Sequence, residues 1–236
     1  MKVSVVIPLY NEQENINLLY SELKEVLDGI DAEYEILFIN DGSEDESLAL
    51  LRSINSNDSQ VKLISFQKNY GQSAALKAGF ERSLGEVIVT MDADLQNDPH
   101  DIPKLMSCIN QGYDLVSGWR KKRVDSLKKR ISSKIANRVR NSIIRDNIND
   151  TGCMLKAYRK DAIKGLEIYS GMHRFLPVLL KMRGAKVVEI EVNHRARRFG
   201  KTKYGIKNRL WKSLIDTFIV LWMKKNYINL QIKEEL

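Results

Sequence analysis

The sequence predicts an α/β fold with a mostly parallel central sheet flanked by helices. Two observations support this prediction. Apolar runs of strand length alternate with stretches of helical periodicity, and a polar cluster follows each apolar run of the first half. The chain has 236 residues, 43% of them hydrophobic, so it can bury a core as one domain or as one domain with a tail. Strands and helices that alternate at this spacing form βαβ units with right-handed crossovers.

Four strand–helix pairs are predicted in the first half of the chain. Ser43 followed by Glu46 predicts a capping box at the start of the second helix, and Pro99 is typical of the start of the fourth. The predicted strands are Val3–Pro8, where Pro8 ends the strand, Ile36–Ile39, Val61–Phe66 and Val87–Met91. The predicted helices run from about Asn11 to Asp28, Ser43 to Ile54, Ala74 to Leu84 and Pro99 to Asn110.

The second half is less regular but continues the same architecture. The predicted strands are Tyr113–Gly118, Cys153–Tyr158 and Lys186–Asn193. The predicted helices run from about Ser126 to Arg145, Phe175 to Met182 and Gly205 to Lys225. The chain shows no internal repeat and no low-complexity tract, so we expect one compact domain with a C-terminal extension.

The net charge of +8 is very unevenly distributed. Residues 120–145 hold eleven Lys and Arg against one acid, and residues 195–212 hold eight and no acid. These two segments sum to +18, so the remainder of the chain carries about −10. Such fields attract nucleic acid, anionic lipid head groups or a phosphorylated substrate, although a charge run can also be a solvated helix face.

The two cysteines and the apolar runs limit the cellular context. Cys108 and Cys153 form no CxxC pair, which is typical of a reducing compartment without a disulfide framework. The N-terminal apolar run Val3–Leu9 is too short for a signal peptide and contains Pro8. No stretch approaches the roughly 18 apolar residues that a membrane-spanning helix needs.

The most informative motif follows the fourth predicted strand. Asp92 and Asp94 are spaced i, i+2, so on an extended chain their carboxylates point to the same side, and Gln96 comes next. Oxygen ligands at the carboxyl end of a parallel strand suit Mg²⁺ or Mn²⁺ that also holds a diphosphate. The alternative is a solvated acidic turn before the helix that Pro99 opens.

Four motifs follow one another along the chain: Val5–Glu12, Asn40–Ser43, Asp92–Gln96 and Arg197-x-x-Gly200-x-Thr202-Lys203. Their order resembles family 2 glycosyltransferases, and more narrowly the polyprenyl-phosphate branch, which includes dolichyl-phosphate mannosyltransferase and bacterial undecaprenyl-phosphate sugar transferases. The resemblance covers residues 2–220. It implies a GT-A fold with a Rossmann-like sheet over residues 1–204, in which 1–98 is the nucleotide-sugar half and 99–204 the acceptor half. Residues 205–236 would form an amphipathic helix and tail.

The resemblance implies specific roles for site residues. Asp94 and Gln96 would bind the metal, Mg²⁺ or Mn²⁺, and Asp92 would bind or orient it. Asn40 and Thr202 stand where many members have Asp and Ser, and both keep hydrogen-bonding capacity. The implied substrate-binding residues are Pro8, Tyr10, Glu12 and Asp41 around the nucleoside, with Asp92, Thr151 and His173; a turn at Asp41 and a structural role for His173 are the alternatives.

Charge arguments give the expected chemistry, which is inverting transfer from a UDP- or GDP-sugar to a polyprenyl phosphate. A divalent ion stabilises the diphosphate leaving group, and Lys203 is a candidate to assist, although it can also be an ordinary solvated lysine. A phosphate acceptor needs no base, because its second pKa is about 6, but it does need cations. The arginines that the resemblance assigns to the acceptor phosphate are Arg120, Arg130 and Arg197.

Three rival functions stay open. A family 2 transferase acting on a sugar hydroxyl would need a base, and Asp150 is the candidate, since no adjacent acidic pair occurs between Asp114 and Asn229. A nucleic-acid binder would use the basic segments, but these lack interleaved aromatic residues, so nucleic acid is not expected as a partner. A catalytically silent nucleotide-sugar binder would not need the combination of Asp94, Gln96, Arg197 and Lys203.

The last predicted helix suggests how the chain meets its lipid substrate. It carries Trp211, Phe218 and Trp222 on one side, with lysines near both ends. Such a helix can lie in an anionic membrane interface or pack on the domain's own core. We expect a cytoplasmic enzyme, peripheral on the cytoplasmic face of the membrane, where a membrane-anchored partner is also conceivable.

Overall fold

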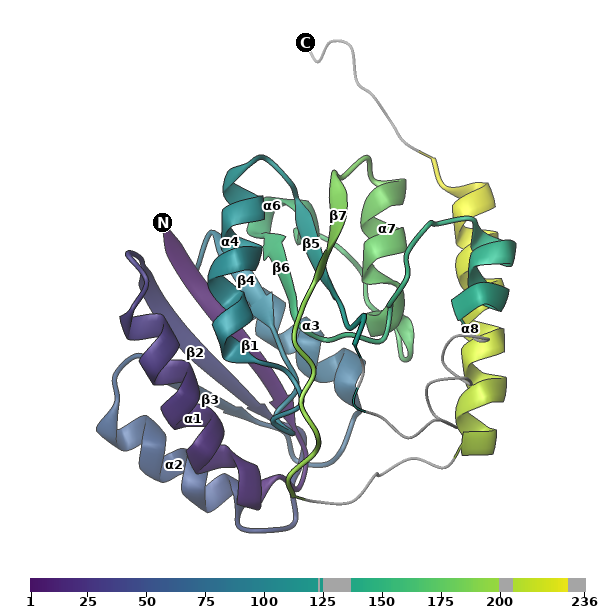
Figure 1. Ribbon diagram of the computed structural model, residues 1–236. Coiled ribbons are helices and arrows are strands. Elements are labelled where there is room, and N and C mark those ends of the chain that lie inside the picture. Colours follow the sequence, from purple (N-terminus) through teal and green to yellow (C-terminus); the bar gives the residue numbers. More distant parts are fainter. Residues whose placement is uncertain (123, 125–136, 200–205, 229–236) are drawn as a thin grey trace, which may run out of the picture.

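The computed structural model describes residues 1–122, 124, 137–199 and 206–228, with side chains from residue 214 onward in the last segment. Its centre is a mixed seven-stranded sheet of order β3-β2-β1-β4-β6-β5-β7 (Figure 1). Only β6 runs antiparallel to its neighbours, β4 and β5, so the predicted mostly parallel sheet is confirmed. The strands are β1 Lys2–Leu9, β2 Glu33–Asn40, β3 Val61–Ser65, β4 Val87–Thr90, β5 Leu115–Trp119, β6 Lys156–Arg159 and β7 Val187–Glu191.

Helices cover both faces of this sheet. Apolar side chains of α1, α2 and α4 form one core with alternate residues of β1, and those of α3, α6, α7 and α8 form a second core on the opposite face. The helices are α1 Gln13–Asp28, α2 Ser47–Asn57, α3 Gln72–Arg82, the 3₁₀ turn η1 Pro99–Asp101, α4 Ile102–Asn110, α6 Lys160–Ile163, the 3₁₀ turn η2 Met172–Phe175, α7 Leu176–Met182 and α8 Ile206–Asn226.

Several sequence-based boundaries were wrong. α2 begins at Ser47, and Ser43 is not its cap, because the Ser43 hydroxyl accepts a hydrogen bond from the Asn11 amide. The strand expected from Cys153 begins only at Lys156. The short elements α6 and η2 were not expected. Of the basic helix predicted over 126–145, residues 137–144 are helical, and 126–136 lie outside the described residues.

Pro8 lies inside β1 and does not end it. β1 pairs with β2 through Leu9, whereas its pairing with β4 ends at Val6 and Thr90. The Leu9 carbonyl accepts from Asp41 on the β2 side, so the nitrogen of Pro8 faces the other side, beyond the end of β4. No ladder hydrogen bond is lost, which is why a proline is tolerated in this central strand.

α8 presents two different faces. Its inner side buries Val220, and the Lys224 ammonium donates to the carbonyl of Ile144 at 2.8 Å. Its outer side exposes large apolar residues, including Phe218 at 59% and Trp222 at 67% exposed. No helix within the described ranges combines the length and the apolar character needed to cross a bilayer.

The packing of α3 on β1 gives a stability prediction. A Cβ atom added at Gly79 would lie 2.3 Å from Cγ1 of the buried Val6, so the helix and strand would have to separate. We expect Gly79→Ala to lower the free energy of unfolding by about 1–2 kcal/mol, because overpacking outweighs the gain in helix propensity. Urea denaturation measures this change.

Two further variants test the cause. Gly29→Ala is the matched control, because its added Cβ would meet nothing closer than 3.4 Å. Val6→Ala in the Gly79→Ala background should recover part of the loss. A Gly79→Ala protein as stable as the wild type would contradict the close-packing argument.

Candidate active site

Most of the predicted site residues gather at one edge of the sheet. β1, β2 and β4 are parallel, and their carboxyl ends carry Tyr10–Glu12, Asp41 and Asp92–Gln96, respectively (lower part of Figure 1). The segment that follows β7 crosses the same edge, where His194 forms a β-bridge with Asn97. The expected location of a site outside the strand ends therefore agrees with this geometry.

Asp41 is held by the start of α3. Its carboxylate is 4% exposed and accepts hydrogen bonds from the amides of Tyr70 at 2.7 Å and Gly71 at 2.9 Å. Burial raises the pKa of Asp41, although both amide hydrogen bonds act in the opposite direction. Gly71 has φ +91°, a conformation that favours glycine, and this turn directs the two amides at one carboxylate.

The loop after β1 is fixed by hydroxyl groups near the start of α2. Ser43 accepts from the Asn11 amide at 2.9 Å, and Ser47 accepts from the Glu12 amide at 3.0 Å. The Glu12 carboxylate in turn accepts from the Asn15 side chain at 2.6 Å. These contacts hold Tyr10–Glu12 beside the Asp41 loop, as the sequence motifs predicted.

Asp92 and Asp94 have different partners although they are only two residues apart. Asp92 accepts from the Gln72 side-chain amide at 2.8 Å, whereas Asp94 pairs with the Arg197 guanidinium at 2.5 Å. Burial, together with the Asp94 charge, raises the pKa of Asp92 to about 7. Burial also raises the pKa of Asp94, and Arg197 opposes that shift. Both carboxylates therefore belong to one electrostatic unit.

The segment Asn193–Arg197 forms a strap across the loop that carries these carboxylates. Asn193 donates to Asp98 and Asp101, and the Arg195 amide donates to the Gln96 carbonyl at 2.9 Å. The Arg195 guanidinium pairs with both Glu22 and Asp98, at 2.5 and 2.6 Å. The strap is thus tied down on both sides just before Arg197 reaches Asp94.

Arg120 and Asp150 form a largely buried bidentate pair. Nε and Nη2 of Arg120 donate to the two carboxylate oxygens of Asp150 at 2.8 and 2.9 Å, and the Arg120 amide adds a third bond at 3.3 Å. Burial disfavours the charged guanidinium, but the Asp150 carboxylate outweighs it and raises the pKa of Arg120. Glu189 fixes Asp150 by accepting from the Asn149 and Asp150 amides.

The other predicted residues fall outside this cluster of contacts or outside the described residues. The Thr151 hydroxyl accepts from Arg140 at 2.6 Å, and Arg140 is paired with Asp146. Nδ1 of His173 lies 2.8 Å from the Ser73 hydroxyl, one residue after Gln72, which binds Asp92. Arg130 and Lys203 lie outside the described residues.

Sequence reasoning missed several contributors. Gln72 and Ser73 lie in the first turn of α3, where they contact Asp92 and His173. Asn97 accepts from the Asp92 amide at 3.0 Å. Lys156 is fully buried on β6. The available signals in the sequence were polar residues at a helix start and a lysine in an apolar strand. Neither signal indicates which residue the side chain contacts in the fold.

The oxygen donors at this edge fit a divalent ion that arrives with a diphosphate. Within the described parts of the chain, no three Asp, Glu, His or Cys side chains converge in a way that could hold an ion by themselves. Mg²⁺ typically binds one or two carboxylates and completes its shell with phosphates and water. Asp92 and Asp94 can supply such carboxylates. The Gln96 amide donates to Asp94 at 3.2 Å, and its side-chain Nε2 lies 3.5 Å from the Arg195 carbonyl.

Comparison with curated proteins finds close relatives. The chain is 38% identical over 205 residues to undecaprenyl-phosphate 4-deoxy-4-formamido-L-arabinose transferase of Aeromonas hydrophila subsp. hydrophila, and 39% identical to the protein of that name from Photorhabdus laumondii subsp. laumondii. Each match covers 86% of this chain and 63% of the relative. The chain thus spans less than two thirds of the length of these relatives.

Solved structures share the fold. Glucosyl-3-phosphoglycerate synthase from Mycobacterium tuberculosis, in complex with Mn²⁺, UDP and phosphoglyceric acid, matches with a TM-score of 0.71 at 17% identity, covering 97% of this chain and 80% of that one. S. aureus TarS 1-349 with UDP-GlcNAc matches with a TM-score of 0.65 at 17% identity, covering 93% and 66%. The family model "Glycosyl transferase family 2" matches residues 4–166. The chain belongs to glycosyl transferase family 2 and has the GT-A fold of its structural neighbours.

Proposed function

We propose that this protein transfers a sugar, with inversion, from a UDP- or GDP-sugar to a polyprenyl phosphate. The observation that carries the proposal is the buried Arg120–Asp150 pair in the acceptor half, which supplies a cation for a phosphate and engages the carboxylate that a hydroxyl acceptor would need as a base. The printed activity of the curated relatives, transfer to undecaprenyl phosphate, supports the same acceptor class.

In this proposal, residues 1–98 bind the donor. Asp41, together with Pro8, Tyr10 and Glu12, would surround the nucleoside; the contact of the Glu12 amide with Ser47 supports this role because it fixes the loop after β1. Asp94, Gln96 and Asp92 would hold Mg²⁺ or Mn²⁺, which when bound stabilises negative charge on the leaving diphosphate. The structural neighbours that were crystallised with Mn²⁺ or Mg²⁺ and UDP support this use of a divalent ion.

Residues 99–204 bind the acceptor. Arg120 presents a guanidinium that is fixed by Asp150, and Arg197, which pairs with Asp94, would bridge toward the donor phosphates. Arg130 and Lys203 keep their proposed roles as further cations for the phosphates. The lipid phosphate is largely dianionic at neutral pH, so its oxygen attacks the anomeric carbon directly and the diphosphate leaves from the opposite face.

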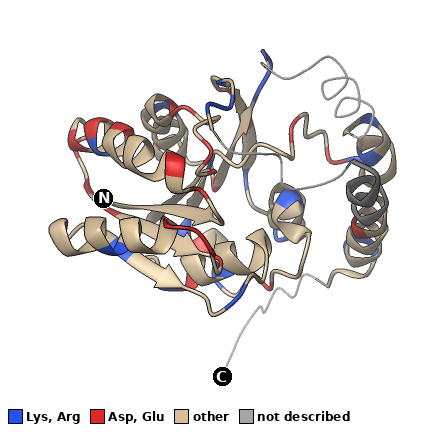
Figure 2. Ribbon diagram, turned by 90° about the horizontal axis from the view of Figure 1, so that it is seen from below, with Lys and Arg blue, Asp and Glu red and all other residues tan. Residues whose placement is uncertain are grey.

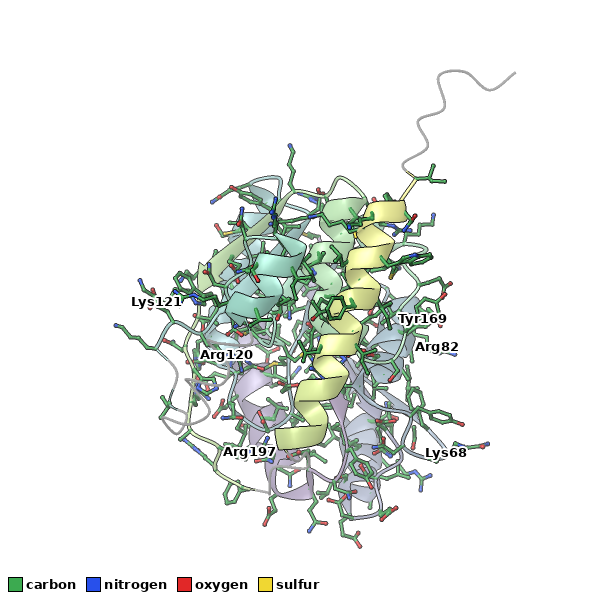
Figure 3. All side chains as sticks on the ribbon, turned by 90° about the vertical axis from the view of Figure 1, so that its right-hand side faces the viewer. Lys68, Arg82, Arg120, Lys121, Tyr169 and Arg197 are labelled. Carbon is green, nitrogen blue, oxygen red and sulfur yellow. The ribbon has the colours of Figure 1, made fainter. Side chains whose placement is uncertain are left out.

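Residues 205–236 would attach the enzyme to the cytoplasmic face of an anionic membrane. The outer face of α8 exposes apolar side chains, and Lys225 follows them in the last turn. Figure 3 looks onto this helix, and Arg120 and Arg197 are both seen on one side of it, whereas Lys68 and Tyr169 are on the other. Most Asp and Glu positions lie on the side of the molecule away from α8 (Figure 2).

A matrix assay tests the proposed reaction. Purified protein with Mn²⁺ or Mg²⁺ is offered UDP- and GDP-sugars, with and without undecaprenyl phosphate, and nucleotide release is measured. We expect release only when metal and lipid phosphate are both present, with a loss of at least about 100-fold in Asp94→Asn, which removes a ligand charge. Asp31→Asn, at an exposed position, is the matched control. Turnover without lipid phosphate would contradict the proposal.

Asp150→Asn separates a phosphate acceptor from a hydroxyl acceptor. If Asp150 only holds Arg120, the variant should raise the KM for the lipid phosphate by about tenfold and keep most of kcat, because the guanidinium loses a charged partner but no proton transfer is lost. Steady-state kinetics on protein that is folded by circular dichroism measure this split. A loss of about 1,000-fold or more in kcat would identify Asp150 as a general base and favour the rival reaction.

Vesicle binding tests the role of α8. Phe218→Ser together with Trp222→Ser should reduce binding to phosphatidylglycerol vesicles by about tenfold or more, since both exposed aromatic rings would otherwise enter the interface. Leu84→Ser is the control, because Leu84 is 62% exposed but belongs to another part of the chain. Equal vesicle binding by the wild type and the double variant would show that this face does not contact lipid.

A further inference from the structure

Lys156 is a fully buried lysine in the middle of the sheet that the proposed reaction does not use. It lies opposite Thr90 of β4 and opposite Ser117 of β5, and all three residues are 0% exposed. Lysine is almost never fully buried without a partner, because an ammonium loses its hydration there. The position therefore calls for a compensating interaction or a function.

The amine of Lys156 points to the edge of the sheet that carries the site. β6 runs antiparallel to β4, so the start of β6 lies beside the end of β4, and Asp92 follows Thr90 by two residues. Nζ of Lys156 donates to the carbonyl of Cys153, which precedes β6. The hydrogen bond of Lys156 thus closes the short segment between the turn at Asp150 and the start of β6.

The groups around this amine are mostly the buried ionisable groups of the site. Burial lowers the pKa of Lys156, the Arg120 charge acts in the same direction, and Cys153, Asp150 and Asp92 oppose them. Conversely, Lys156 and Arg120 both act to lower the pKa of Asp92. The strand register with Thr90, two residues before Asp92, and the hydrogen bond to Cys153, three residues after Asp150, place Lys156 between the segments that carry these groups.

We propose that Lys156 is a positioning residue that supplies a fixed positive charge beside the site. Because of this charge, the site prefers a metal–diphosphate complex over a bare divalent ion. The inference rests on the proposed function. A positive charge that acts on Asp92 opposes a free cation but favours the anionic diphosphate that accompanies it. The hydrogen bond to Cys153 also holds the turn that carries Asp150, and through it Arg120.

Mn²⁺ binding without nucleotide tests this role, because loss of the charge should increase the Mn²⁺ affinity, whereas structural damage would decrease it. By electron paramagnetic resonance, Lys156→Met and Lys156→Gln should bind free Mn²⁺ more tightly, on the order of tenfold, because a repelling charge is gone. The factor by which UDP increases Mn²⁺ affinity should fall correspondingly. Lys156→Arg, which keeps the charge, should retain the wild-type values.

The variants also separate charge from hydrogen bonding. Glutamine can still donate to the Cys153 carbonyl, so a Lys156→Gln protein with wild-type Mn²⁺ affinity would overturn the electrostatic role. Weaker or unchanged Mn²⁺ binding in both neutral variants would overturn it as well. Lys160→Met is the matched control, because Lys160 likewise donates to a backbone carbonyl, that of Ser83 at 2.6 Å, and should leave Mn²⁺ affinity unchanged.

A measurement on the wild type covers the case in which the neutral variants do not fold. Nitrogen-15 NMR of labelled lysine distinguishes an ammonium from a neutral amine at Lys156 at neutral pH, and a neutral amine would overturn the proposal. Failure of the inference differs from failure of the proposed function. If only the inference is wrong, the wild type still shows Mn²⁺-dependent UDP binding and lipid-dependent turnover. If the proposed function is wrong, the wild type shows neither.

Discussion

Three carboxylates, those of Asp41, Asp92 and Asp94, follow the parallel strands β2 and β4 at one edge of the sheet, and two segments hold them, the start of α3 and the strap Asn193–Arg197. Asp41 receives two backbone amides at the start of α3, Asp92 receives the Gln72 amide, and Asp94 receives the Arg197 guanidinium. Partly buried like charges raise one another's pKa unless they gain partners. The start of α3 and the strap that ends at Arg197 therefore supply the hydrogen bonds and the positive charge that oppose these upward pKa shifts.

The same need for compensating partners explains the Arg120–Asp150 pair. Asp150 could have been a catalytic base, yet its two oxygens are both engaged by Arg120, and Glu189 fixes the backbone beneath it. A buried bidentate ion pair is a poor base, since protonating the carboxylate would leave a buried guanidinium uncompensated. It is a good anchor for a phosphate, because the guanidinium is held in one orientation. This is why the pair, more than the surrounding positive charge, favours a phosphate acceptor.

The sequence predicted the features that depend on local residue patterns. It could not predict the side-chain contacts between residues that are distant along the chain. Alternating apolar runs gave the parallel sheet, and Asp92–Gln96 marked the right strand end, because strand ends in a βαβ fold meet at one edge. Ser43 looked like a helix cap, but its hydroxyl bonds Asn11, 32 residues away. Asp150 was a free candidate base in the sequence and is ion-paired in the fold. Gln72 could not be recognised from the sequence, because its role depends on Asp92, which lies beside it only in the folded chain.

One turn links α8 to the candidate site at the strand ends. Gly171 has φ +88°, and a Cβ there would lie 2.4 Å from the Asp216 carboxylate on the inner side of α8. The Gly171 amide donates to Ser73, whose hydroxyl also contacts His173 and whose neighbour Gln72 binds Asp92. A shift of α8 against this turn must therefore be absorbed by the turn itself or passed to the first residues of α3. Under the proposed function, in which the donor comes from water and the acceptor from lipid, such a connection would couple the binding of the two substrates at the strand ends beside α3.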